Sequence, residues 1–125
     1  MKRWVVDSSV LIDASRDRAE AVRFLSEAAD EGEFWSVTPV RTEIRWGMWA
    51  TEAQIVERLL AGIRWVEVSV ALADRAGDHG RRWGRSHGLS VIDAIVAAAA
   101  EQLDAQVATL NIRDFPMFPD LQPPY

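Results

Sequence analysis

Four carboxylates occupy comparable places in the sequence, each close to the end of an apolar segment. They are Asp7, Glu43, Asp93 and Asp114. Ligand crevices in parallel α/β proteins lie outside the carboxyl ends of the strands, so we expect these four side chains to converge on one edge of a sheet. Carboxylates in one cleft repel one another unless a cation neutralises them, and hard oxygen ligands favour Mg²⁺ or Mn²⁺. Because water on such an ion can attack a phosphodiester, the pattern predicts a metal-dependent phosphodiesterase.

Each of these acids also has a plainer structural interpretation. Asp7 could open a solvated turn, and Glu43 could be an exposed helix residue. Asp93 and Asp114 could each be the third residue of a helix capping box. The coincidence of all four at one sheet edge favours a functional site over four unrelated roles.

The elements that must position these acids alternate between short apolar segments and longer amphipathic ones. This alternation predicts one α/β domain over residues 1–125, with a mostly parallel sheet of four to five strands and helices on both faces. The expected strands cover 4–6, 34–38, 63–68 and 106–110. The expected helices cover 18–31, 38–50, 51–61, 71–87 and 90–103, with Gly32 ending the first and a break near Gly77 and Gly80 in the fourth.

The bulk composition excludes several other classes of protein. The chain has no cysteine, which excludes disulfide frameworks and thiolate zinc sites. Its net charge of −5 has the wrong sign for a protein that coats nucleic acid by charge alone. We find neither a membrane-spanning apolar run nor a secretory signal, and we expect a cytoplasmic protein without membrane partners.

The ordered motifs resemble those of PIN-domain nucleases. Their residues are most similar to those of VapC-type toxins of bacterial toxin–antitoxin pairs. The matching segments are Val5–Ile12, Thr38–Pro39 with Thr42–Ile44, Leu89–Ala97 and Thr109–Phe115. Each motif is weak alone, but the set spans nearly the whole chain in the family's order.

The resemblance implies an endoribonuclease dependent on Mg²⁺ or Mn²⁺, with tRNA or another structured RNA as substrate. It implies that Asp7 and Asp93 are the main metal ligands, with Glu43 beside them. Some members carry an acid where this chain has Asn111, so either Asn111 or Asp114 fills the fourth position. Further candidates are Ser9, Thr109 and Arg113. The implied partners are a VapB-like antitoxin whose tail occupies the active-site groove and a second copy of the chain, in a homodimer or a toxin–antitoxin hetero-oligomer.

Arginines supply all the positive charge except that of Lys2, and several could contact substrate phosphates. Arg81, Arg82 and Arg85 cluster in one predicted helix, and Arg113 adjoins the fourth motif. The alternative is a solvated helix face. His79 and His87 lie in the same polar helix, where solvated rather than catalytic histidines are expected, which disfavours a Ser/His hydrolase.

The predicted helix that contains Glu43 carries more large apolar side chains than one face can bury. Trp46, Met48 and Trp49 cannot all point to the same core as Ile44, because successive helical residues are 100° apart. We therefore expect Trp46 or Trp49 to contact the antitoxin or a second protomer. The alternative places both tryptophans under the proline-rich tail.

Three other functions are alternatives to a toxin nuclease. A phosphoacceptor receiver domain needs a lysine near its last strand, whereas the only lysine here is Lys2. A catalytically inactive PIN-like scaffold would bind a partner without cleaving RNA. An RNA-processing PIN nuclease would cleave RNA without a toxin role.

Overall fold

The computed structural model describes residues 1–125 and contains four strands, six α-helices and two short 3₁₀ helices. The strands are β1 (Lys2–Val6), β2 (Gly32–Val37), β3 (Ile63–Val66) and β4 (Gln106–Ala108). The α-helices are α1 (Ser8–Ser15), α2 (Ala19–Ala29), α3 (Thr38–Gly47), α4 (Ala53–Ala61), α5 (Val70–His87) and α6 (Val91–Leu103). The 3₁₀ helices are η1 (Ala50–Glu52) and η2 (Ile112–Asp114).

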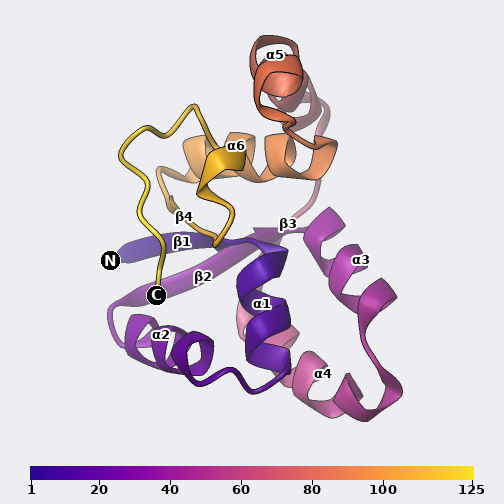
Figure 1. Cartoon of the computed structure of the whole chain (residues 1–125), viewed down its shortest axis with the longest axis vertical. Helices are drawn as coiled ribbons and strands as arrows, with labels where there is room; N and C mark the ends of the chain where they lie inside the picture. Colours follow the sequence, from indigo (N-terminus) through magenta and orange to yellow (C-terminus); the bar gives the residue numbers. More distant parts are fainter.

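The four strands form one fully parallel sheet in the order β3-β2-β1-β4. Helices α1 to α4 lie on one side of this sheet, and α6 lies on the other side with α5 outside it (Figure 1). The predicted α/β architecture, with a parallel sheet between helical layers, is therefore confirmed.

The strand order creates a topological switch beside β1. The chain runs outward from β1 through β2 to β3, then returns through α5 and α6 to place β4 on the other side of β1. Ligand crevices in open α/β sheets lie at such a switch, outside the carboxyl ends of the diverging strands. Asp7 directly follows β1 and Thr109 directly follows β4, so both residues lie at this position.

The hydrophobic core is built from the sheet and from the helix that lies directly on it. Val5, Val6 and Val37 are completely buried in the central strands. Helix α6 is buried from Ala94 to Ala100 without interruption, in keeping with a sequence that is apolar nearly all round. Small alanine side chains let α6 approach both the sheet and α5 closely.

Three glycines behave differently from the sequence-based expectation. Gly32 begins β2 instead of ending a helix, and a Cβ there would lie 1.9 Å from the backbone oxygen of Lys2. Helix α5 is continuous through Gly77 and Gly80. A helical glycine costs about 1 kcal/mol but keeps its backbone hydrogen bonds, so it weakens a helix without breaking it.

The segment after η2 contains no helix or strand, but it is attached to the body of the protein. Phe115 is buried in the core, and the Tyr125 hydroxyl donates to Asp13 Oδ2 at 2.8 Å. The Arg18 guanidinium lies 5.6 Å from the centre of the Tyr125 ring. None of the helices is both long enough and apolar enough to cross a membrane.

Candidate active site

Asp7 lies at the junction of β1 and α1 and is only 2% exposed. Its Oδ1 accepts a hydrogen bond from the Ser8 backbone N–H at 2.8 Å, so the carboxylate caps α1. Its Oδ2 accepts from the Thr109 hydroxyl at 2.7 Å. The Asp7 backbone N–H donates to the Ala108 carbonyl at 2.9 Å, which ties the residue to β4. These bonds fix the carboxylate at the sheet switch.

Thr109 belongs to a small network of hydroxyls that holds this carboxylate from the β4 side. It is fully buried, and its hydroxyl oxygen accepts from the Asn111 backbone N–H at 3.0 Å. The Ser9 hydroxyl donates to Asp7 Oδ2 at 3.4 Å and accepts from the Leu110 N–H at 3.2 Å. Ser9 and Thr109, both named as candidates, are thus brought together around Asp7.

Glu43 and Asp93 reach the same region from two helices on opposite sides of the sheet. Glu43 lies in α3, which begins at Thr38 directly after β2. Asp93 is the third residue of α6, where its backbone N–H donates to the Ser90 hydroxyl at 3.1 Å and its carboxylate accepts from the Ser90 N–H at 3.4 Å. The capping interpretation of Asp93 is therefore correct, and it coexists with proximity to the other acids.

Charge interactions link Asp7, Glu43 and Asp93 to one another at this edge, and link Asp114 to Asp7 and Asp93. Burial is the largest cause of the raised pKa of Asp7, and the charge of Asp114 adds to it. The pKa of Glu43 is raised by desolvation and then by the charges of Asp7 and Asp93. The pKa of Asp93 is likewise raised by desolvation, then by Asp7 and Asp114. We call these four carboxylates (Asp7, Glu43, Asp93 and Asp114) the acidic cluster.

The fourth motif supplies one member of the acidic cluster and two residues outside it. Asp114 lies in η2 and makes no capping hydrogen bond, so its interpretation as a helix cap is wrong. The Asn111 side chain is exposed and makes no hydrogen bond, although its backbone N–H supports Thr109. Arg113 is exposed and forms no ion pair.

The donor chemistry of the acidic cluster fits a hard divalent cation. All four side chains offer carboxylate oxygens, and three have a raised pKa that a bound cation would lower. No three His, Cys, Asp or Glu side chains lie close enough together to form a ready-made metal site. Any ion would therefore have to draw the carboxylates together or bind through water, as Mg²⁺ commonly does.

An open cavity of about 530 Å³ adjoins the acidic cluster on the α3 side. Glu43 and Trp46 of α3 line it, together with Ile92 of α6. Trp46 is 88% exposed and Trp49 is 64% exposed, so neither lies under the tail. Met48 instead packs against the core. The prediction that aromatic surface stays uncovered is confirmed, although α3 ends at Gly47 and Trp49 lies beyond it.

Sequence reasoning missed the environment of His79. The residue is only 5% exposed, and its Nε2 pairs with Glu101 of α6, so the expectation of a solvated histidine is wrong. His87 is exposed as expected. The polar neighbours of His79 along α5 conceal a partner 22 positions away, which no local pattern identifies.

A parallel α/β sheet with acidic residues at its switch point is compatible with several classes of domain, and comparison with known proteins identifies the class. Residues 4–119 match the PIN domain family. Ribonuclease VapC19 from Mycobacterium tuberculosis is 35% identical over 97% of this chain and 98% of its own length. Ribonuclease VapC10 from the same organism is 39% identical over 97% of this chain and 92% of its own length.

A toxin–antitoxin complex from Klebsiella pneumoniae contains a chain with the same fold, at a TM-score of 0.76 and 22% sequence identity. That match covers 100% of this chain and 98% of the other. The protein belongs to the PIN-domain family, and within it to the VapC group of ribonucleases. PIN-domain nucleases generally use divalent metals.

Replacing Thr109 with valine should lower RNA cleavage by disturbing the position of the Asp7 carboxylate, while the protein stays folded. The change keeps the shape but removes the donor to Asp7 Oδ2 and the acceptor for Asn111. Loss of a residue that orients a metal ligand typically costs 10–100-fold, so we expect RNA cleavage to fall by about that factor. The metal concentration for half-maximal cleavage should also rise. Thr51→Val at an exposed position is the control, and equal cleavage by both variants would remove Thr109 from the site.

Proposed function

We propose that the protein is a divalent-metal-dependent endoribonuclease, the toxin of a toxin–antitoxin pair, and that residues 1–125 form one domain. The observation that carries this proposal is the acidic cluster at the sheet switch, where burial and then neighbouring carboxylates raise the pKa of Asp7, Glu43 and Asp93. The similarity to two VapC ribonucleases supports the same reaction.

In the proposed mechanism, Asp7 and Asp93 would hold the cation, with Glu43 beside them. When bound, a divalent ion supplies a nucleophilic water and neutralises charge that develops on the scissile phosphate. Thr109 and Ser9 orient the Asp7 carboxylate from the β4 side. Asp114 contributes a fourth carboxylate from η2, whose charge acts on Asp7 and Asp93.

The finer assignments concern substrate and partners. We propose a structured RNA such as tRNA as substrate, a location in the cytoplasm where such RNA is found, and a homodimer as the free form. We also propose a VapB-like antitoxin, because the structural neighbour with the same fold is part of a toxin–antitoxin complex. The exposed Trp46 and Trp49 are the proposed contact surface, and because Trp46 lines the same cavity as Glu43, the antitoxin would lie next to the acidic cluster.

The direct test incubates the purified protein with a folded tRNA and maps the RNA ends that are produced. We expect cleavage with Mg²⁺ or Mn²⁺, loss of cleavage with EDTA, and suppression by the antitoxin encoded beside the gene. An RNA that stays intact under all metal conditions would favour the inactive scaffold. Cleavage without growth arrest on expression, and without a neighbouring antitoxin gene, would favour the RNA-processing nuclease.

A further inference from the structure

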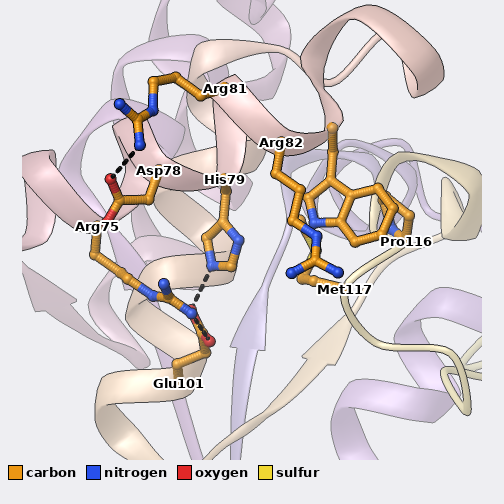
Figure 2. A pocket seen from close by; sticks show the side chains of 9 residues that line it. Arg75, Asp78, His79, Arg81, Arg82, Glu101, Pro116 and Met117 are labelled. Carbon is orange, nitrogen blue, oxygen red and sulfur yellow. Dashed lines mark hydrogen bonds and ion pairs between the residues drawn. The ribbon is translucent and has the colours of Figure 1, made fainter.

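A second cavity, of about 730 Å³, lies away from the acidic cluster, between α5, the C-terminal half of α6 and the segment after η2. Figure 2 shows its labelled side chains: Arg82 reaches in from α5 beside Pro116 and Met117, and Glu101 rises from α6. The mechanism proposed above uses none of these residues. The volume is within the range of cavities that hold small organic ligands.

The charges around this cavity leave one arginine without a partner. Arg75 donates to Glu101 at 2.8 and 3.2 Å, and Arg81 lies 3.9 Å from Asp78. Arg82 forms no ion pair, and no dashed line reaches it in Figure 2. The cavity therefore has an uncompensated positive charge on a protein whose net charge is −5.

An aromatic ring supports this unpaired charge. The Arg82 guanidinium lies 4.8 Å from the centre of the Trp83 ring. Pro116 and Met117 add apolar surface opposite α5. A free guanidinium with its donors available, next to aromatic and apolar surface, suits a ligand that has both a phosphate and a planar base.

The opposite wall of the cavity is already formed. His79 is buried and pairs with Glu101, which also binds Arg75. Although desolvation acts to raise the pKa of Glu101, its bonds to Arg75 and His79 bring that pKa below the ordinary value. Glu101 therefore stays ionised and occupied by its two partners. It does not compete for Arg82.

The cavity is joined to the acidic cluster through two continuous pieces of chain. Glu101 follows Asp93 by eight residues on α6, about 12 Å along the helix axis at 1.5 Å per residue. Pro116 follows Asp114 by two residues. An RNA strand whose scissile phosphate lies at the acidic cluster can therefore reach the cavity within a few nucleotides.

We propose that this cavity is a subsite for one nucleotide of the RNA substrate, away from the cleaved bond, with its phosphate on Arg82 and its base against Trp83 and Met117. The proposal rests on the proposed function and adds to it a contact that helps to select the RNA. An acidic segment of the antitoxin would offer related chemistry, and the experiment below separates the two.

The test compares R82Q with R85Q, because both changes remove one unpaired arginine from α5 but only Arg82 lines the cavity. Binding of a short single-stranded oligoribonucleotide is measured in EDTA, where no cleavage occurs, over a range of salt concentrations. We expect R82Q to weaken binding about tenfold and to reduce the salt slope by about 0.7, the value for one phosphate on a single strand. R85Q should change neither by more than a small fraction of this.

A second variant tests the base contact independently of charge removal from α5. Met117→Ala removes apolar surface from the cavity without changing its charge, and should weaken binding severalfold while leaving the salt slope unchanged. Equal effects of R82Q and R85Q, or no effect of Met117→Ala, would overturn the subsite. Weaker antitoxin binding by R82Q with unchanged RNA binding would overturn it in favour of a protein ligand. If the wild-type protein neither binds nor cleaves RNA, the proposed function fails as well, whereas cleavage with no effect of R82Q removes the subsite alone.

Discussion

Asp7→Asn should abolish RNA cleavage while the protein stays folded. Asp7 is at the centre of the acidic cluster, since its charge raises the pKa of both Glu43 and Asp93. Removing a metal ligand should cost more than the 10–100-fold typical of an outer partner, so we expect a loss above about a hundredfold. The measurement is the initial rate of RNA cleavage at saturating Mn²⁺, with the exposed Asp120→Asn as a matched control.

The same substitution should stabilise the metal-free protein. Burial raises the pKa of Asp7 above its ordinary value of 3.8, so the folded state binds this proton more tightly than the unfolded chain. The contribution of Asp7 to stability is therefore most favourable at low pH and is lost as the pH rises from about 4 through the raised pKa. Asparagine keeps the shape, removes this cost, and should raise Tm at neutral pH.

Divalent metal should reverse the order of stability of the two proteins. A ligand at a hundred times its Kd stabilises the folded state by about 2.7 kcal/mol, and the wild type should show a Tm increase of corresponding size with Mn²⁺. Asp7→Asn should show little increase. A variant that cleaves RNA like the wild type, or that responds equally to Mn²⁺, would refute the assignment of Asp7 as a ligand.

The parts of the fold that could be predicted from the sequence are those set by local patterns. Apolar residues 4–6 followed by an acid predict a buried strand that ends at a site, and β1 and Asp7 have that arrangement. The Ser90–Asp93 capping box identifies the start of α6. Pro39 directly after Thr38 identifies the start of α3 in the same way.

The parts that could not be predicted depend on partners distant in the sequence. Thr109 donates to Asp7 across 102 positions, and only the pairing of β4 with β1 brings them together. His79 is concealed in the same way, because Glu101 lies on another helix. Gly32 follows a predicted helix, where glycine commonly ends helices. In the structure its lack of a side chain instead allows close contact with the Lys2 backbone on the neighbouring strand β1.

The two exposed tryptophans are held in place differently, and this bears on their proposed role. The Trp49 ring lies 4.8 Å from the Arg16 guanidinium, and Arg16 in turn pairs with Glu52 at 3.3 Å. Glu52 is buried and accepts from the Trp49 backbone N–H at 2.8 Å. Trp46 has no such support and lines the cavity that Glu43 also lines. A rigid ring at Trp49 loses little entropy on binding, which suits an anchor.

Trp46→Ala and Trp49→Ala should each weaken antitoxin binding by about thirtyfold or more. Large aromatic residues at the centre of an interface typically contribute at least about 2 kcal/mol when truncated, which corresponds to that factor. Val70→Ala is the control, because Val70 is also a highly exposed apolar residue but begins α5 on the other side of the sheet. Antitoxin affinity and oligomeric state are measured together for all three variants, with Tm as the check on folding.

Loss of the dimer with normal antitoxin binding would assign the surface to a second protomer. If both tryptophan variants dimerise and bind antitoxin like the wild type, the surface beside Glu43 serves neither partner. Because Trp46 and Glu43 line the same cavity, an antitoxin anchored there would also obstruct RNA at the acidic cluster, so cleavage by Trp46→Ala should resist antitoxin at concentrations that silence the wild type.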